Sequence, residues 1–350
     1  MFLPKKAKNF FIDSNDHVVL LARASKGSAP FVVEEVLECA PNDDQSFQEA
    51  LRAVQVGKVP SGYLHAACGV NSPRRVVRKV TLETKRLKEA GYLNEVVTQQ
   101  MRVEPDQYAL AILNAANGTD YDLVRGGQKE ALMCGLPTAD VHHAQDALLA
   151  SGIFPETIEL SSVGSIGAMV DYLSFAKIKT PVLMLEVEAD TTTSFIVTSS
   201  GLEASRPIQQ GLNAMIPVVQ KELGLKDEDS AKKLFLSNTF DFTGMGSILI
   251  KKLIKELQSS IGFYEVQTGQ SIAQVACTLL PAKLAWLENA IAADLGVSVL
   301  KPDIPAWLQS HQITLADGVP ANAQDARRLG LFGLMVKYNN SHAVVLEKAQ

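Results

Sequence analysis

The sequence of 350 residues lacks the features that define several common classes of protein. Its four cysteines, Cys39, Cys68, Cys134 and Cys277, are scattered, and no two have the Cys-x-x-Cys spacing that is typical of zinc and redox sites. We therefore expect buried, reduced thiols, no metal centre and a cytoplasmic chain.

Long apolar runs and strong basic patches are also missing. No apolar run reaches the roughly 18 residues that a membrane-spanning helix needs. The net charge is −5 and no strong basic patch stands out beyond Arg74-Arg75 and Arg78-Lys79, so a nucleic-acid partner is disfavoured. The beginning, MFLPKKAKNFFID, has no apolar core before a cleavage site, which argues against a signal peptide. Its Phe-Leu and Lys-Lys pairs could touch an anionic membrane surface, although a solvated terminus is the simpler interpretation.

The composition that remains is that of an ordinary globular protein, with 47% hydrophobic and 20% charged residues and enough length for two or three domains. Alternating apolar residues and good hairpin turns predict three successive strands at residues 9–13, 18–24 and 31–39. A second such meander follows about 170 residues later, at residues 182–188, 194–198 and 202–208. This repetition, with helices after each meander, predicts two related α/β lobes.

Apolar periodicity predicts the other elements. Strands are expected at residues 62–70 and 74–82 and in the segments YALAILNAA, KEALMCGLP and SIAQVACTLL. Helices are expected at residues 46–56, 85–100, 139–151, 163–175, 212–223, 230–236, 248–262, 282–295 and 324–337. The elements between residues 62 and 153 are extra to the first lobe, which predicts an insertion there.

Four segments carry a likeness to a known family through their order and spacing. They are KKAKNFFIDSNDHVVLL at residues 5–21, RPIQQGLNAMIPVVQKELGL at 206–225, the helix-strand-helix stretch at 250–296, and ARRLGLFGLMV at 326–336. Together they resemble the PilM family of type IV pilus assembly proteins, which belongs to the actin-like ATPase superfamily. The pattern is also similar to FtsA and to the cytoplasmic part of GspL secretion proteins.

This resemblance implies an α/β fold of two actin-like (ribonuclease-H-like) lobes with an inserted α+β subdomain in the first lobe. The first lobe would comprise residues 1–61 and 154–179, and the insert residues 62–153. The second lobe would comprise residues 180–350, with a helical insertion at about 212–265. Its closing helix, at 324–337, could pack on the first lobe.

The resemblance also implies partners at the inner face of the cytoplasmic membrane. PilM-like proteins take a short N-terminal peptide of the membrane protein PilN in a groove beside the insert. Arg74, Arg75 and Arg78 are our candidate groove residues, chosen for their charge and for the exposed alternation of the segment. Contact with pilus motor ATPases, a peripheral position at the inner membrane and self-association are further expectations from the same resemblance.

A nucleotide site between the lobes is implied as well, with ATP and Mg²⁺ as its ligands. Such a site needs two hairpin turns whose backbone N–H groups reach the phosphates, and acids that hold the metal ion through water. The positions that match are Asp13, Ser14 and Asn15 in the first turn, Glu186, Glu188, Asp190, Thr191 and Thr192 in the second, Glu159 between the lobes, and Cys277 with Thr278.

The second turn departs from the family pattern. Where the family has Asp-x-Gly-Ala-x-x-Thr-Thr, this chain has EVEADTTT at residues 186–193, so Glu188 replaces the glycine. A side chain and a negative charge would then stand where a phosphate is bound. Ala-Gly-Gly-Thr likewise becomes Ala-Cys-Thr-Leu at residues 276–279. These changes predict a degenerate site, and the acids and hydroxyls could equally be ordinary capping of a hairpin turn.

Two functions remain open from the sequence. One is a non-catalytic scaffold that binds a PilN-like peptide and links the pilus platform to motors. The other is an active actin-like ATPase or kinase that hydrolyses ATP between the lobes with Asp13, Glu159 and Glu186. The loss of the glycines favours the scaffold, because without them the backbone cannot approach the phosphates closely.

Overall fold

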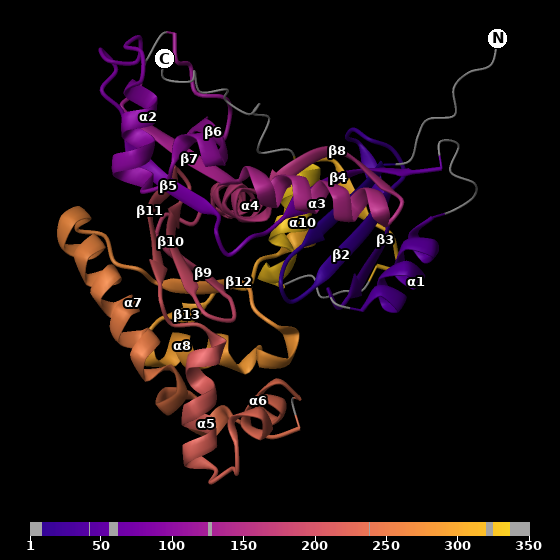
Figure 1. The fold of residues 1–350 in the computed structure, drawn as a ribbon, viewed down its shortest axis with the longest axis vertical. Coiled ribbons are helices and arrows are strands. Elements are labelled where there is room, and N and C mark those ends of the chain that lie inside the picture. The colour runs from indigo at the N-terminus through magenta and orange to yellow at the C-terminus, as the bar shows by residue number, and fades with distance from the viewer. Residues whose placement is uncertain are drawn as a thin grey trace.

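The first lobe is built on a mixed sheet that opens with an antiparallel meander (Figure 1). The structure is a computed structural model that describes residues 9–41, 43–55, 62–124, 128–237, 239–319 and 325–336. In these ranges the strand order of the sheet is β14-β3-β2-β1-β4-β8. The bounds are Asn9–Ser14 for β1, Val19–Ala24 for β2, Phe31–Cys39 for β3, Leu64–Val70 for β4, Ile153–Leu160 for β8 and Ile313–Leu315 for β14.

Strands β1, β4 and β8 run parallel, and this direction places two predicted positions, Asp13 and Glu159, at one edge of the sheet. Asp13 lies opposite Gly69, and Gly69 lies opposite Glu159. The carboxyl ends of parallel strands gather at the same edge, which is where α/β sheets usually place their sites. On the other side, helix α1 (Asp44–Val54) packs its apolar residues on a small core that includes Ile12 and Leu21.

The second lobe repeats the opening meander. Its sheet has the order β11-β10-β9-β12-β13 in the described residues. The bounds are Val182–Val187 for β9, Thr192–Thr198 for β10, Gly201–Ile208 for β11, Gln274–Leu279 for β12 and Ser298–Val299 for β13. Every residue of β9 is buried, because helices or strands cover both faces of this central strand.

The insert has a sheet and a small core of its own. Its sheet has the order β5-β7-β6, with bounds Val76–Thr81, Glu130–Pro137 and Tyr108–Asn114. The short helix α2 (Tyr92–Val96) and the π-helical turn η1 (Val97–Met101) pack against it. Strand β5 also lies beside β11 of the second lobe, where Ser205 Oγ donates a hydrogen bond to Val77 O at 2.7 Å and Lys79 pairs with Glu203 at 3.0 Å.

Helix α4 (Ser161–Phe175) lies at the centre of the molecule (Figure 1). It contacts strands of the first and second lobes, and one hydrophobic cluster joins it to both lobes and to strands β6 and β7 of the insert. Helix α10 (Leu329–Val336) packs against α4 and the ends of β1 and β4. Burial of both helices on almost all sides explains their nearly continuous apolar sequences.

Helix α3 (Thr138–Ala150) contacts β8 and strands of the insert, and helix α9 (Ile304–Ser310) contacts β14 of the first sheet. The remaining helices surround the second sheet. They are α5 (Ile216–Glu222), α6 (Glu228–Ser237), α7 (Gly246–Thr268) and α8 (Trp286–Leu295). The single-turn 3₁₀ segments are η2 (Pro105–Gln107), η3 (Leu212–Met215), η4 (Thr243–Met245), η5 (Ala282–Leu284) and η6 (Ala326–Arg328). None of the helices in the described part of the chain has both the length and the apolar composition that a membrane crossing requires.

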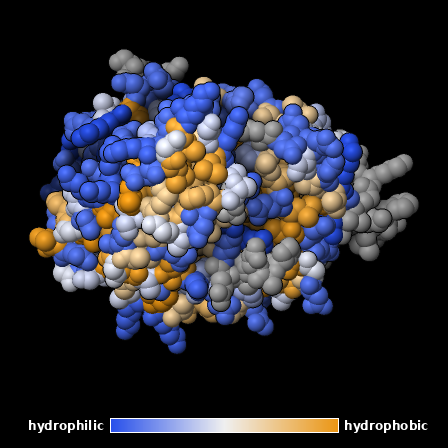
Figure 2. All heavy atoms as spheres, turned by 90° about the horizontal axis from the view of Figure 1, so that it is seen from below, coloured by the Kyte–Doolittle hydropathy of each residue, from blue (hydrophilic) through white to orange (hydrophobic). Residues whose placement is uncertain are grey.

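Figure 2 shows the molecule from below, where apolar side chains gather between hydrophilic ones. Three large apolar residues of this end of the second lobe, Leu236, Phe240 and Ile248, are at least one third exposed. Exposed apolar residues in such numbers are common on folded proteins.

Sheet pairing differs from the expected domain boundaries in two places. Strand β4 lies inside the expected insert of residues 62–153, but it is a central strand of the first sheet. Strand β14 lies inside the expected second lobe, but it pairs with β3 of the first sheet. Helix α10 packs on β1 and β4 of the first lobe, which is the packing considered above for the closing helix. The insert that the structure supports therefore runs from β5 to β7. We propose that the chain returns to the first lobe after about residue 310.

Two elements also differ from the sequence prediction. The helix expected at 85–100 exists only from Tyr92 onward, because residues 85–91 form turns that end at Gly91 with φ of 80°. Strand β8 was not predicted, since Pro155 argues against a central strand. It lies at the edge of its sheet, where a missing N–H is tolerated. Residues 324 and 337 of the expected closing helix, and the N-terminal residues 1–8, lie outside the described residues.

Candidate functional site

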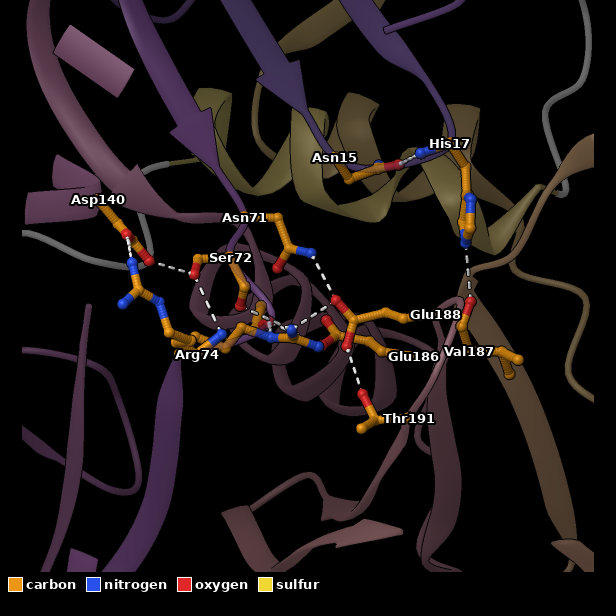
Figure 3. A network of polar contacts seen from close by, with 12 residues as sticks. Asn15, His17, Asn71, Ser72, Arg74, Asp140, Glu186, Val187, Glu188 and Thr191 are labelled. Carbon is orange, nitrogen blue, oxygen red and sulfur yellow. Dashed lines mark hydrogen bonds and ion pairs between the residues drawn. The ribbon is translucent and has the colours of Figure 1, made fainter. Parts of the chain in front are cut away.

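The turns of the two meanders face each other between the lobes (Figure 3). In the first turn, Asn15 Oδ1 accepts hydrogen bonds from the backbone N–H groups of His17 and Val18, at 2.9 and 3.1 Å. The ring of His17 then reaches the second turn, with its Nε2 atom 2.9 Å from the carbonyl oxygen of Val187. The two turns are therefore linked directly, at the position where phosphates would have to lie between them.

Asp13 is enclosed at the end of β1 and is only 3% exposed. Ser161, at the start of α4, donates a hydrogen bond to its Oδ1 at 2.6 Å. On the other side α10 comes so close that a Cβ atom at Gly330 would collide with Asp13 Oδ2. Burial raises the pKa of Asp13 from 3.8 to about 6, while the Ser161 hydrogen bond opposes this shift and the charge of Glu186 adds to it.

Arg75 occupies the space beside the second turn. Its guanidinium pairs with Glu186 at 2.5 Å and with Glu188 at 2.8 Å, and the three side chains are 4%, 3% and 2% exposed. Arg75 lies in the insert, just before β5. Glu186 lies within β9 of the second lobe, and Glu188 directly follows the end of that strand. This buried ion-pair triad thus connects the insert to the second lobe.

The triad is well supplied with hydrogen bonds. Arg75 Nε donates to Ser162 Oγ at 2.7 Å, and Arg75 Nη1 donates to the carbonyl oxygen of Ser72 at 3.0 Å. Three further side-chain hydrogen bonds complete the network: Ser162 Oγ donates to Glu186 at 2.7 Å, and Asn71 Nδ2 and Thr191 Oγ1 donate to Glu188 at 3.1 and 3.2 Å. Burial by itself would lower the pKa of Arg75, but the charges of Glu186 and Glu188 more than offset this and raise it.

The second turn is held in place by backbone contacts from behind. The N–H groups of Leu212 and Asn213 donate to the carbonyl oxygens of Glu188 and Ala189, at 2.9 and 2.7 Å. Gly211 makes this approach possible, since a Cβ atom there would lie 2.6 Å from three backbone atoms of the turn. Asp190 is exposed and accepts from Asn213 Nδ2 at 2.8 Å, and buried Thr192 donates to Gln210 O at 2.7 Å.

The other expected positions lie farther along the two sheets. Cys277 and Thr278 are buried in β12, where the ladder with β9 is irregular and Cys277 N–H donates to Glu288 at 2.6 Å. Burial, with a smaller effect of the Glu288 charge, raises the pKa of the Cys277 thiol well above its ordinary value. Glu159 is half-buried in β8, and after the dominant effect of burial its charge contributes to raising the pKa of Cys134 to about 12.

The structure brings Asp13, Asn15, Glu186, Glu188 and Thr191 together at the junction of the lobes. Ser14 ends β1 beside them, half-buried. Of the three arginines expected in a partner groove, Arg75 lies instead inside the molecule. Arg74 is 64% exposed and pairs with Asp140, and Arg78 donates from Nη1 to the carbonyl oxygen of Gln100 at 2.5 Å.

Sequence reasoning missed the role of Arg75. The residue is 111 positions from Glu186, and no local pattern connects the two segments. The sequence did contain a signal. Two glutamates at the end of a buried strand need a cation that keeps its charge when it is buried. Arginine, which stays charged in proteins, is the residue that meets this need.

These residues do not fit a nucleotide with Mg²⁺. The acid of the first turn is sealed under α10, both glutamates of the second turn are paired with Arg75, and the turns contact each other through His17. Within the described residues no group of three or more His, Cys, Asp or Glu side chains is arranged to hold a metal ion. The arrangement holds the lobes and the insert together.

Comparison with known proteins gives structural matches only. No protein-family model and no curated protein sequence matches the chain. A structure described as the PilM-PilN type IV pilus biogenesis complex matches with a TM-score of 0.68 and 13% identity, covering 96% of this chain and 100% of the matched chain. The ethanolamine utilization protein EutJ from Carboxydothermus hydrogenoformans matches with a TM-score of 0.46 and 9% identity, covering 95% of this chain and 90% of that protein. The cytoplasmic domain of EpsL of the Vibrio cholerae type II secretion system gives 0.42 and 9%, with coverage of 95% and 94%.

The first of these matches extends over the whole of both chains, and it agrees with the two meander-led lobes and the insert described above. An identity of 13% supports a shared fold and no more than that. The chain has an actin-like fold of two lobes, in the form that the PilM-PilN structure also has.

Proposed function

We propose that this chain is a PilM-like scaffold of a type IV pilus, or of a related secretion system, at the cytoplasmic face of the inner membrane. In this role it binds the N-terminal peptide of a PilN-like membrane protein beside the insert and connects the platform to motor ATPases. The observation that carries the proposal is the match over the whole chain to a protein solved in complex with PilN. Self-association belongs to the same proposal.

The state of the interlobe site supports a scaffold rather than an ATPase or a kinase. Arg75 fills the position beside the second turn, and it supplies to Glu186 and Glu188 the positive charge that a metal ion would otherwise bring. An enzyme that transfers a phosphoryl group must hold the phosphates and the metal ion in that space. The proposed scaffold therefore works without nucleotide turnover.

Peptide binding tests the proposal directly. A synthetic peptide with the first residues of a PilN-like protein from the same organism should bind in calorimetry with micromolar affinity, and a peptide of the same composition in scrambled order should not. Arg74→Ala and Arg78→Ala should weaken binding if the groove lies beside the insert. Absence of binding for the native peptide would overturn the proposal.

Nucleotide binding is the second test. Calorimetry with ATP and Mg²⁺ should give no heat of binding for the native chain. Glu188→Gly alone should also fail, because Arg75 still fills the site, whereas Glu188→Gly combined with Arg75→Ala should permit weak binding. Micromolar ATP binding by the native chain would contradict the closed site and reopen the ATPase alternative.

A further inference from the structure

A cavity of about 110 Å³ lies between the insert and the second lobe, where β5 passes over β10 and β11. Its apolar part is formed by Val77, Met101 and Phe195, and its polar part by Arg78, Thr193 and Ser205. Roughly 10–15 Å³ of such space is enough for one water molecule, so this cavity has room for a small molecule. No acidic side chain of the described residues lines it.

Arg78 differs from the ion-paired arginines of the described chain in the charge around it. Six arginines of the described chain each pair with a carboxylate: Arg23, Arg74, Arg75, Arg86, Arg206 and Arg327. Arg78 is half-buried, yet among the described residues it has a carbonyl oxygen as its partner and no carboxylate. Burial, together with the nearby charge of Arg102, lowers the pKa of Arg78. A positive charge is thus held in a partly desolvated place without compensation, which is unfavourable unless an anion joins it.

The nearest acids cannot serve as that anion. Glu186 and Glu188 are engaged by Arg75, and Glu203 is engaged by Lys79. The hydroxyl of Thr193 makes no hydrogen bond with the described residues, so a donor is available in the lining beside Arg78. A guanidinium and a hydroxyl next to an apolar floor are the groups that recognise a carboxylate on a compact apolar body.

We propose that this cavity is a binding site for a small organic carboxylate. The carboxylate pairs with Arg78, and its apolar part lies against Val77, Met101 and Phe195. The carboxylate can belong to a free acid or to the C-terminus of a partner chain, since both present the same chemistry. The cavity shares Arg78 with the candidate peptide groove and Arg75 with the ion-pair triad. Small acids are used as probes below, so that their binding is measured separately from that of the PilN-like peptide.

Binding is measured by calorimetry or by NMR titration of the full chain. The probes are isobutyrate, its neutral analogue isobutyramide and inorganic phosphate. The dipeptide N-acetyl-Ala-Val, as the free acid and as the amide, then distinguishes a free acid from a chain terminus. We expect saturable binding of isobutyrate and none of isobutyramide. Tighter binding of the dipeptide acid than of isobutyrate, with no binding of its amide, would assign the site to a chain terminus. The reverse order would assign it to a free acid. Both results support a carboxylate site.

Variants connect the binding to Arg78. Arg78→Gln should weaken isobutyrate binding roughly tenfold or more, which is the usual effect of losing a hydrogen bond to a charged group. Arg78→Lys, which keeps the charge and a donor to Gln100, provides a variant that should stay folded and should weaken binding less. Arg86→Gln is the matched control, because Arg86 is an exposed arginine of the same insert that pairs with Glu89 and Glu95.

Three results would overturn the proposal. They are equal binding of isobutyramide and isobutyrate, phosphate binding as tight as that of isobutyrate, and equal losses in Arg78→Gln and Arg86→Gln. Failure of every probe to saturate at tens of millimolar would do the same, provided that circular dichroism shows the chain to be folded.

Discussion

The two turns that meet between the lobes are closed by different physical means. The first turn is closed by neutral hydrogen bonds and by packing, with Asn15 capping the backbone and α10 covering Asp13. The second turn is closed by charge, since Glu186 and Glu188 are both paired with Arg75. The same element, a hairpin after the first strand of a lobe, thus has its acids buried in two unrelated ways.

The difference shows where each turn is vulnerable. A desolvated acid such as Asp13 destabilises the fold whenever it is ionised, so the first turn depends on pH. A buried triad depends instead on the presence of all its members, because removing one partner leaves the others charged and unpaired. The following changes test this distinction, and they are ordered from the largest expected effect to the smallest.

Arg75→Met should lower the free energy of unfolding by about 3–5 kcal/mol at pH 7, because two buried carboxylates lose their cation. Combining Arg75→Met with Glu186→Gln and Glu188→Gln should recover much of this loss. Urea unfolding at pH 7 measures both effects.

Arg86→Met is the control for this prediction. Arg86 has several glutamate partners as well, namely Glu83, Glu89 and Glu95, but these carboxylates are exposed at the surface of the insert. Solvent screens such pairs, and we expect no measurable change in unfolding. Equal losses of unfolding free energy in Arg75→Met and Arg86→Met would mean that burial of the triad does not increase the cost of removing its cation.

Gly211→Ala should destabilise the second turn by about 2–3 kcal/mol, because the new methyl group meets backbone atoms that cannot move aside. Gly262→Ala is the matched control. Gly262 lies within α7 with nothing within 4 Å of a new Cβ atom, so alanine there should stabilise by about 0.5–1 kcal/mol. We expect Gly211→Ala to lower the melting temperature and Gly262→Ala to raise it. An unchanged melting temperature in Gly211→Ala would contradict the close approach of Gly211 to the backbone of the turn.

Asp13→Asn should stabilise the protein by on the order of 2 kcal/mol at pH 8. The folded state holds the proton of Asp13 up to a pKa of about 6, compared with 3.8 for the ordinary group. The stability that this proton contributes is complete below about pH 4 and is lost as the pH rises through 6. The variant, which cannot ionise, escapes that loss. The two melting temperatures should therefore converge at pH 4, and a constant difference at all pH values would refute the assignment.

Asn15→Ala should cost about 1 kcal/mol, since two backbone N–H groups lose the oxygen that accepts from them. Asn117→Ala removes a similar contact to Thr119 in an exposed turn and should cost less. Hydrogen exchange at His17 and Val18 would report the local effect. Unchanged protection there would show that the cap is not needed.

The meanders of both lobes were predictable because their signals are local. Alternation and turn residues place strands at 9–13, 18–24 and 31–39, and β1, β2 and β3 differ from these by at most one residue at an end. The likeness to PilM-type proteins correctly indicated two actin-like lobes and an insert. Short elements such as β14 were missed, because three residues carry no periodicity and the pairing partner lies at the other end of the chain.

The candidate site was predictable in its acids but not in its cation. Asp13, Glu186 and Glu188 lie at or just beyond strand ends, where a sequence pattern can place them. Their partner Arg75 lies in the insert, and only the packing of the insert on the second lobe brings it near. The same limit applies to Arg78, whose lack of a carboxylate is a property of the folded surroundings and not of its neighbours in sequence.

The origin of Arg75 in the chain itself has a consequence for control. A bound solute fills its site according to its concentration. The occupancy of an ordinary nucleotide site therefore depends on the nucleotide concentration in the cell. A guanidinium that is tethered a few residues beyond the end of β4 has a fixed effective concentration. The joint between the lobes is then insensitive to metabolism, and only a partner that moves the insert can alter it.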